Sequence, residues 1–534
     1  MPDIAGQPSG ITFGYTCRNC NRRPRGARQG ASSVNDIPGN TPILVGAGQY
    51  VERGASAESP SSLAARAAAA ALADAGGNAL AAAIDTIAVV RFFADSSPLW
   101  ACPFGRSNNP PQSIARAIGA NPRQRIYTEV GGNQPQSRLI EFARDIARGA
   151  RDVVLFAGAE AIRNQRQAER QGTTLDWNEE FHEPLDDRGF GADLFTAQEI
   201  HNGLVMPVLF YALIEQARAH AAGRSTTEQR SRIAALLASF SAVAAANPYA
   251  QFPGAQSAAE ILAAAPMTHL YTKRMVAQDG VNQAAALLLT SVAKARELGI
   301  ARERWVFLHG MAEGAEWNLS ERPDPGEAPV AGAVLARAFA LAGRGVADIG
   351  PIDIYSCFAC AVSAIATHLG LPDDGSRALT LTGGLPYFGG PGNNYSMHAI
   401  AEMVWRLRRE PEAFGLVTAN GGMLSKHAAG IYSCRPSAVD WTRAQTAVAT
   451  EAFARRRIAM TPDSGRIVSW TVNWAGSDPV QAVVIGETAA GERFVACTAA
   501  GDATTVHAML ERDYTGHGVR VRTASGQTLH FSMA

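Results

Sequence analysis

Gly383-Gly-Leu-Pro-Tyr-Phe-Gly-Gly-Pro391 is a stretch of nine residues with four glycines and two prolines. This density predicts a turn, because glycine permits backbone conformations that other residues avoid and proline interrupts regular elements. The apolar stretch Ala378–Leu381 before it predicts a strand, and the periodic stretch Ser396–Arg408 after it predicts a helix. The turn is therefore expected to connect a strand to a helix.

The same alternation of strand and helix surrounds this turn on both sides. Predicted strands lie at Trp305–Gly310, Ile352–Tyr355 and Gly415–Ala419, and predicted helices lie at Val330–Leu341 and Ala359–Leu369. Because strands that are apolar throughout are buried on both faces, the series favours a parallel or mixed sheet covered by helices.

A similar series occurs earlier in the chain. Its predicted strands are Ile43–Ala47, Thr86–Arg91, Arg125–Glu129 and Asp152–Ala157, and its predicted helices are Ser59–Gly76, Ser113–Ile118 and Ser137–Arg148. Two copies of one βαβαβαβ unit indicate a duplicated fold of the α/β class.

The pattern of elements divides the chain into parts. Residues 41–164 and 276–303 form an N-terminal half, residues 165–275 a polar and helical inserted loop domain, and residues 304–438 a C-terminal half. Residues 439–534 change to short strands separated by turns, which predicts a small β-rich domain of the OB or barrel type. Residues 1–40, in which Gly, Arg, Asn and Ser dominate, predict a disordered tail.

The composition narrows the classes of function. The 534 residues contain 48 Lys and Arg and 48 Asp and Glu, so no net charge attracts nucleic acid or an anionic membrane surface. The longest apolar runs, such as Ala284–Leu289, are far shorter than the ~18 residues that span a bilayer. An odd and thinly spread set of cysteines, with no apolar region after Met1, predicts a soluble cytoplasmic protein.

Cys17 and Cys20 in the tail have the spacing of half a zinc site. A tetrahedral site needs four ligands, and no second Cys or His pair lies nearby in the sequence. No metal site is therefore expected, and the pair is interpreted as incidental.

Three stretches resemble the thiolase superfamily over residues 41–435. Gly383–Pro391 is similar to the GGxxxxGHP turn of that family in every fixed residue except the histidine, which is Gly390 here. Ile352-Asp-Ile-Tyr-Ser-Cys-Phe358 resembles the NEAF motif and, more closely, the HDCF motif of sterol-carrier-protein thiolases. Residues 148–160 are similar to the segment that follows the thiolase nucleophile. The resemblance implies two thiolase-type halves in a layered αβαβα core with an inserted loop domain.

Thiolases make or break a carbon–carbon bond alpha to a thioester with a nucleophilic cysteine, a histidine and a second cysteine. By the spacing of the family, the nucleophile would fall near Gly132, and residues 129–136 contain no cysteine, serine or threonine. Gly390 replaces the histidine, and Thr418 or Ala419 replaces the second cysteine. Ordinary thiolase activity is therefore not expected.

Cys357 takes the place of the HDCF cysteine, which in sterol-carrier-protein thiolases can act as acid and base. It lies at the start of a predicted helix whose dipole favours the thiolate, and it is the first candidate for a catalytic role. The alternatives are a small buried thiol, like Cys360 one turn on, or a redox pair formed by the two cysteines.

Further candidates follow the same turns and strands. Tyr355, Tyr395 and His398 are candidates to donate to an oxyanion or to move a proton. Tyr387 lies in the same turn, and His427 is a candidate to replace the lost histidine. For each of them the alternative is a packing residue or a solvated turn. The candidate oxyanion and backbone groups are Gly132, Asn133, Gly390, Asn420 and Gly421.

The missing groups and the β-rich appendage look most like the thiolase-like proteins of type 1, which carry an additional C-terminal domain. That resemblance implies lipid metabolism, recognition of CoA or acyl-CoA, and no covalently bound cofactor. The expected function is an acyltransferase or an enzyme that forms or cleaves a carbon–carbon bond. The alternatives are a non-catalytic acyl-CoA-binding protein and an aldolase-type lyase, as in thiolase-fold steroid aldolases that work with a small β-barrel partner. Thiolases pair through their first half, which implies a homodimer, and the additional domain leaves a monomer as the alternative.

Overall fold

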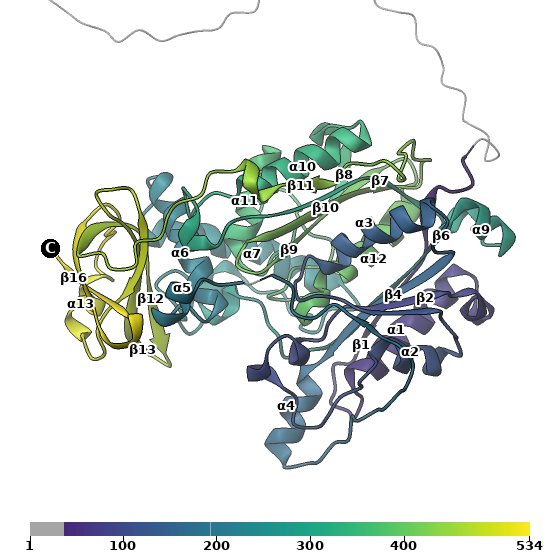
Figure 1. Ribbon diagram of the computed structural model, residues 1–534, viewed down its shortest axis with the longest axis horizontal. Coiled ribbons are helices and arrows are strands. Elements are labelled where there is room, and N and C mark those ends of the chain that lie inside the picture. The colour runs from purple at the N-terminus through teal and green to yellow at the C-terminus, as the bar shows by residue number, and fades with distance from the viewer. Residues whose placement is uncertain (1–36, 193) are drawn as a thin grey trace, which may run out of the picture. The chain divides into compact units, whose positions relative to one another are not determined.

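The strands of the two halves join in one mixed β-sheet (Figure 1). The computed structural model describes residues 37–192 and 194–534, so the predicted tail, with Cys17 and Cys20, lies outside the described residues apart from residues 37–40. The strands of the sheet are β1 Pro42–Val51, β2 Thr86–Val89, β3 Gln124–Tyr127, β4 Val153–Ala161, β5 Asp186–Asp187, β6 Asn282–Ser291, β7 Val306–Ala315, β8 Ile349–Asp353, β9 Phe414–Gly421, β10 Lys426–Ser433 and β11 Ala447–Val448. Within the described residues their spatial order is β5-β3-β2-β4-β6-β1-β7-β10-β9-β8, with β11 paired to β7.

The order of the strands repeats one unit. β3, β2 and β4 are parallel neighbours, and β6 and β1 follow them as antiparallel strands. In the second half β8 and β9 are parallel, and β10 and β7 follow as antiparallel strands. β1 and β7 join the two halves in the middle of the sheet. The predicted duplicated α/β fold is confirmed.

The predicted strand Ala378–Leu381 does not form, although it would be the counterpart of β3 in the second half. Its backbone is held instead by Asp353 at the end of β8. Oδ2 of Asp353 accepts hydrogen bonds from the N–H groups of Leu381 (2.8 Å) and Thr382 (3.0 Å), so these donors are not available to a neighbouring strand. Burial raises the pKa of Asp353 to about 6, although these hydrogen bonds act in the opposite direction.

The helices form three layers with the strands between them. Their bounds are α1 Pro60–Ala75, α2 Pro110–Ile118, α3 Gln134–Ala147, α10 Pro329–Ala342, α11 Ala359–Leu369 and α12 Tyr395–Arg409. α3 and α12 lie next to each other and contact strands of both halves, as the centre of Figure 1 shows. α1 covers β1, β6 and β4 from the other side, with α2 beside it, and α10 covers β7 and β10, with α11 beside it. The predicted αβαβα layering is confirmed.

The segment between β4 and β6 is mainly helical, as predicted for residues 165–275. Its helices are α4 Ile162–Gln171, α5 Ala197–His201, α6 Pro207–Ala221, α7 Thr226–Ala246 and α8 Ala258–Leu262. α6 and α7 both contact α11 of the second half. The inserted segment therefore packs on the half of the core that carries Cys357.

The C-terminal residues form a closed barrel, which confirms the predicted β-rich domain. Its strands are β12 Ser464–Ala475, β13 Asp478–Glu487, β14 Arg493–Cys497, β15 Gly518–Thr523 and β16 Leu529–Met533, with the short helix α13 Ala503–Ala508. β12 packs on α6, and the Ser469 hydroxyl donates to the Leu213 carbonyl of that helix (2.6 Å).

Asp513 in the barrel binds polar groups of α6 as well as its own domain. Oδ1 accepts hydrogen bonds from Trp470 Nε1 (2.9 Å) and from Gln216 Nε2 of α6 (3.0 Å), and Oδ2 lies 2.6 Å from Nδ1 of His220. Burial alone would raise the pKa of Asp513, but the bonds from Trp470, Thr515 and His220 outweigh it and lower the pKa to about 2.

We expect the Asp513→Asn variant to be less stable than the wild type by roughly 1 kcal/mol, a value reduced for the partial exposure of this carboxylate. Because the pKa is lower in the folded than in the unfolded state, the contribution is present above about pH 4. It is lost as the pH falls from about 4 towards 2. Denaturant unfolding measured at pH steps checks this, and a difference between variant and wild type that stays constant from pH 6 to pH 2 would contradict it.

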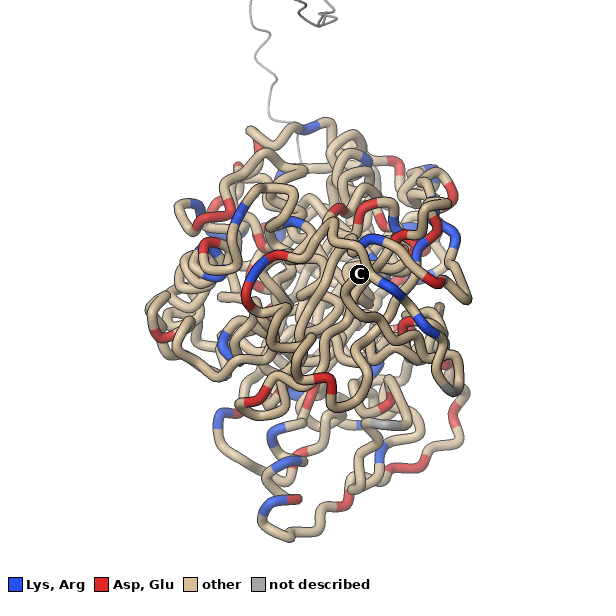
Figure 2. Tube along the Cα trace, turned by 90° about the vertical axis from the view of Figure 1, so that its left-hand side faces the viewer, with Lys and Arg blue, Asp and Glu red and all other residues tan. Residues whose placement is uncertain are grey.

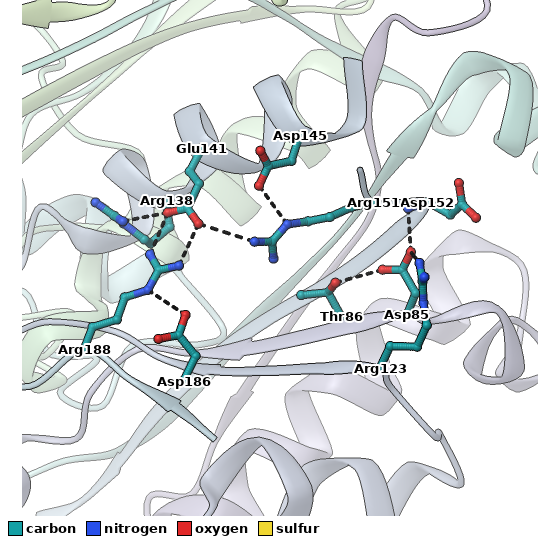
Figure 3. Close-up of polar contacts among 10 residues, drawn as sticks. All are labelled: Asp85, Thr86, Arg123, Arg138, Glu141, Asp145, Arg151, Asp152, Asp186 and Arg188. Carbon is teal, nitrogen blue, oxygen red and sulfur yellow. Dashed lines mark hydrogen bonds and ion pairs between the residues drawn. The ribbon is translucent and has the colours of Figure 1, made fainter. Parts of the chain in front are cut away.

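The outer edge of β3 is covered by β5, which pairs in parallel with Ile126 and Tyr127. The chain that continues from β5 is tied to α3, because Arg188 donates to both carboxylate oxygens of Glu141 (2.6 and 2.7 Å). Glu141 also accepts from Arg138, and Figure 3 shows the three side chains together. Ile126 and Tyr127 of β3 are therefore covered by β5, and an ion-pair network lies beside this edge of the sheet.

Figure 2 shows basic and acidic positions interspersed along the part of the chain that the structure describes. Among the residues that the structure describes, no helix is both long and apolar enough to cross a membrane.

Candidate functional site

Three loops at the ends of β3, β8 and β9 come together. Gly132 lies in the loop before α3, and a Cβ atom built on it would be 2.3 Å from the Tyr355 hydroxyl oxygen and 2.5 Å from the Asn420 carbonyl oxygen. A real Cβ atom never comes this close to another heavy atom. The position at which the thiolase resemblance expects the nucleophile is therefore occupied by the Tyr355 hydroxyl, and glycine is the residue that leaves room for it.

Cys357 lies in the same cluster, between β8 and α11. Asn420 Nδ2 is 3.6 Å from the Cys357 sulfur. Burial raises the pKa of the Cys357 thiol to about 11, although hydrogen bonding with Tyr211 and Asn420 acts to lower it. The expectation that the helix dipole favours a thiolate is therefore wrong, because the loss of solvation is the larger effect at a thiol that is only 9% exposed.

We expect the alkylation of Cys357 by iodoacetamide to be slow at pH 7.5 and to accelerate about tenfold for each pH unit up to about pH 11, because only the thiolate reacts. The measurement is the mass of the peptide that contains Cys357 after reaction at a series of pH values. A rate that is already independent of pH between pH 6 and pH 8 would show instead that the helix dipole prevails.

Tyr211 of α6 is a member of this cluster that the sequence did not reveal. Its hydroxyl oxygen accepts hydrogen bonds from Asn420 Nδ2 (2.8 Å) and from the Leu424 N–H (3.1 Å), and it donates to the Gly422 carbonyl (3.1 Å). Its ring stacks on Phe358, with the centroids 4.2 Å apart. In the sequence Tyr211 is one aromatic residue in an apolar helix, so only the packing of the inserted segment could show its place.

The N-terminus of α3 presents the backbone donors of the site. The Gly131 N–H donates to Asn393 Oδ1 (3.1 Å), whereas no acceptor within residues 37–192 and 194–534 lies in hydrogen-bond geometry with the Gly132 N–H. Free N–H groups at a helix N-terminus favour negative charge on a bound oxygen. Gly421 lies against this loop, because a Cβ atom on it would be 2.5 Å from Asn133 Oδ1. The predicted group of Gly132, Asn133, Asn420 and Gly421 is thus brought together.

Gly390 is not available as an oxyanion donor, contrary to the prediction. Its N–H donates to the Gln278 carbonyl (2.7 Å), and the N–H of the preceding Ala277 donates to the Cys357 carbonyl (3.1 Å). The turn that carries Gly390 is therefore hydrogen-bonded to the end of the inserted segment, next to the cluster. Tyr387 in the same turn has a similar role, because its hydroxyl donates to the Arg274 carbonyl (3.0 Å).

His427 is on β10, a strand that is not among those predicted from the sequence. It stands directly opposite Asn420 in the β9–β10 pair, so both side chains leave the sheet on the same face. Its Nε2 lies 3.7 Å from Glu316 Oε1. Burial and the Arg322 charge lower the pKa of His427 to about 3, which makes it a neutral and weak base at physiological pH.

Tyr395 and His398 begin α12, and only the first of them reaches the cluster. The ring of Tyr395 meets the ring of Tyr355 edge-on at a centroid distance of 5.2 Å, while its hydroxyl is bonded to Thr382. His398 is bonded through Nδ1 to Gln49 Oε1 of β1 (2.6 Å), and burial lowers its pKa to about 3. His398 is thus directed into the core between α12 and β1.

The similarity to solved structures extends over most of the chain. Human mitochondrial 3-ketoacyl-CoA thiolase in complex with CoA is 15% identical, with a TM-score of 0.51 over 74% of this chain and 98% of that chain. The Ltp2-ChsH2(DUF35) aldolase is 21% identical, with a TM-score of 0.54 over 74% of this chain and 98% of that chain. At these identities the likeness concerns the fold alone.

No protein-family model and no curated protein sequence matches the chain. A monomeric SCP2-thiolase-like protein type 1 from Mycobacterium smegmatis, known from its crystal structure, is 35% identical, with a TM-score of 0.78 over 93% of this chain and 100% of that chain. An alignment over 93% of the chain includes at least part of the barrel as well as the layered core. The chain therefore belongs to the SCP2-thiolase-like proteins of type 1.

Proposed function

We propose that the protein is an acyl-CoA-dependent enzyme that cleaves or forms a carbon–carbon bond at the α carbon of a CoA thioester without an acyl-cysteine intermediate. The observation that carries this proposal is the Tyr355 hydroxyl, which fills the position of a nucleophile beside Gly132. A reaction that passes through an enolate needs hydrogen-bond donors and a proton carrier but no nucleophile on the protein.

The cluster supplies both kinds of group. In the cleavage direction the electron pair of the broken bond passes into the thioester as an enolate, and its oxygen would accept hydrogen bonds from the Gly132 N–H and the Tyr355 hydroxyl. The Cys357 thiol, protonated at neutral pH, would donate its proton to the α carbon. The β-hydroxyl group loses one proton as it becomes a carbonyl, and an equivalent proton from solvent restores the Cys357 thiol, so the overall reaction is balanced. In the reverse direction the Cys357 thiolate would remove the α proton. We assign Asn420 and Tyr211 the task of orienting the sulfur, because both are bonded to it in the resting protein.

CoA enters the proposal as the carrier of the acyl group and not as a resident cofactor. A thiolase of the same fold is known in complex with CoA, which supports a CoA thioester as the ligand. His427, His398 and Gly390 have no step in this scheme, because burial makes both imidazoles weak bases and the Gly390 N–H donates to the Gln278 carbonyl.

Among the reactions of this kind, an aldolase-type cleavage of a β-hydroxyacyl thioester is favoured over acyl transfer. Acyl transfer in thiolases requires the nucleophile that Gly132 cannot provide, whereas retro-aldol cleavage does not. A second observation points the same way, because an aldolase with a DUF35 component shares the fold, and the barrel of this chain packs directly on α6, which carries Tyr211.

The experiment that tests the proposal is hydrogen–deuterium exchange at the α carbon of saturated acyl-CoA thioesters in deuterated water, followed by mass spectrometry. We expect exchange above the buffer rate and no increase in the mass of the protein. Binding of the thioesters without any exchange across a panel of chain lengths would overturn the enzyme proposal in favour of a non-catalytic acyl-CoA-binding protein. A stable acyl adduct on Cys357 would overturn the proposed mechanism.

A further inference from the structure

A cavity of about 580 Å³ lies in the first half, at the carboxyl ends of β2 and β4. Its wall comes from the start of α1, the segment from Phe92 to Ser107, the end of β4 and the loop that follows α4. We call it the Glu160 cavity. None of the residues in its wall belongs to the cluster of Gly132, Tyr355 and Cys357, and its volume is within the range of small-molecule sites in proteins.

The wall of the Glu160 cavity is mainly apolar. Phe92, Ile162, Trp177 and Phe190 are among its residues. Phe190 is 55% exposed, so an aromatic ring is presented to solvent beside the cavity. An apolar wall with an exposed aromatic residue favours an apolar ligand over water, because burying apolar surface on both partners is favourable.

Glu160 is the buried polar group of the wall and is only 2% exposed. Its Oε1 accepts a hydrogen bond from the Phe93 N–H (2.7 Å), and its side chain is part of the cavity wall. A carboxyl group can form more than one hydrogen bond, so a ligand in the cavity can form a further hydrogen bond with it.

The other charged groups of the wall are already paired. Asp95 accepts from Arg106 (2.5 Å) and from the Tyr127 hydroxyl (2.6 Å), so the charge of Arg106 is balanced by a carboxylate of the same wall. Burial and the carboxylates of Asp95 and Asp279 raise the pKa of Glu160, which favours the protonated acid. A protonated carboxyl group donates a hydrogen bond, and its natural partner is a neutral oxygen acceptor.

We propose that the Glu160 cavity binds an uncharged, mainly apolar small molecule that places a carbonyl or ester oxygen opposite the carboxyl group of Glu160. The site is distinct from the thiolase-like cluster, so the proposal does not rest on the proposed enzyme activity. One residue, Asn393, connects the thiolase-like cluster to the Glu160 cavity. It accepts a hydrogen bond from the Gly131 N–H (3.1 Å) and donates one to the hydroxyl of Ser96 (3.0 Å), which is beside the cavity.

Nile red is a suitable probe because it is neutral, apolar, carries a carbonyl oxygen and becomes fluorescent in an apolar environment. Titration of the full-length protein should give saturable binding, and Glu160→Leu and Ala94→Trp, which fills the cavity, should weaken it about tenfold or more. Glu160→Gln keeps a donor at this position and should stay within about threefold of the wild type. Glu297→Leu on the exposed face of α9 (Val292–Glu297) is the matched control and should bind like the wild type.

Cys102 allows the same test without any substitution, since its thiol is in the wall of the cavity and is partly exposed. With Nile red at about ten times its Kd, alkylation of Cys102 by N-ethylmaleimide should slow about tenfold, in proportion to the fraction of empty sites. The peptide that contains Cys102 is followed by mass spectrometry. Absence of saturable binding, binding that leaves the alkylation rate unchanged, or equal affinity of Glu160→Leu and the wild type would each overturn the proposal.

Discussion

Replacing Cys357 by alanine is expected to reduce α-proton exchange of an acyl-CoA thioester by about 10²–10⁴-fold, the usual contribution of a positioned acid or base. The physical reason is that no other thiol, carboxylate or imidazole within the described residues is bonded to Asn420 in this cluster. The backbone donors of Gly132 remain in the variant, so binding of the thioester should change little. Exchange rates and CoA-thioester affinities measured on the same samples separate the two effects.

Cys360→Ala is the matched control for this experiment. Cys360 is in the first turn of α11, is fully buried and receives a hydrogen bond from Tyr271 (3.4 Å), and its thiol contacts the backbone carbonyl of Tyr211 (3.6 Å) rather than the Tyr211 hydroxyl or Asn420. Its removal should lower stability but leave the exchange rate within about threefold of the wild type. An equal loss of exchange in both variants would show that helix packing, and not the Cys357 proton, is responsible.

Restoring a cysteine at position 132 is expected to destabilise the protein by about 3 kcal/mol, the cost of forcing atoms into a well-packed site. Both neighbours of the new Cβ atom, the Tyr355 hydroxyl and the Asn420 carbonyl, are closer than contact distance. Thermal unfolding followed by circular dichroism measures the loss. No acyl adduct is expected on this variant. The new side chain would overlap with the Tyr355 hydroxyl and the Asn420 carbonyl, so its thiol would not be positioned to attack a bound thioester.

A second substitution shows which neighbour of position 132 causes the loss of stability in Gly132→Cys. Gly132→Cys combined with Tyr355→Asn removes the phenol but not the Asn420 carbonyl, so we expect it to recover only part of the lost stability. Gly54→Cys is the control, because a Cβ atom there meets nothing within 4 Å. If Gly132→Cys were as stable as Gly54→Cys, the close packing of Gly132 against Tyr355 would be refuted.

The fold could be predicted from the sequence because the apolar periodicity of its strands and helices is local. The prediction was wrong where a single side chain decided the backbone, as when Asp353 took the N–H groups of Leu381 and Thr382 and prevented a strand. It also missed β10, because the glycines before Lys426 and the polar Lys426 and His427 are typical of a turn, whereas the structure buries most of this strand.

The candidate site could be predicted only in part, for a similar reason. Motif spacing placed Tyr355, Cys357 and Asn420 in one cluster, since each follows a strand that ends at the same edge of the sheet. It could not foresee Tyr211, which reaches the cluster from the inserted segment, nor that Gly390 is bonded to Gln278. The protonation of Cys357 depends on how completely the surrounding helices exclude water, and that is a property of the packed chain.

The short strand β5 has a consequence for how copies of this protein meet. β5 pairs with Ile126 and Tyr127 of β3 within one chain, and the carboxylate of its second residue, Asp187, is paired with Arg91. Pairing of another molecule with these two residues of β3 would first require the separation of β5 from β3 and the loss of that ion pair. Assembly by this route thus starts with an energetic penalty that an open strand edge would not impose.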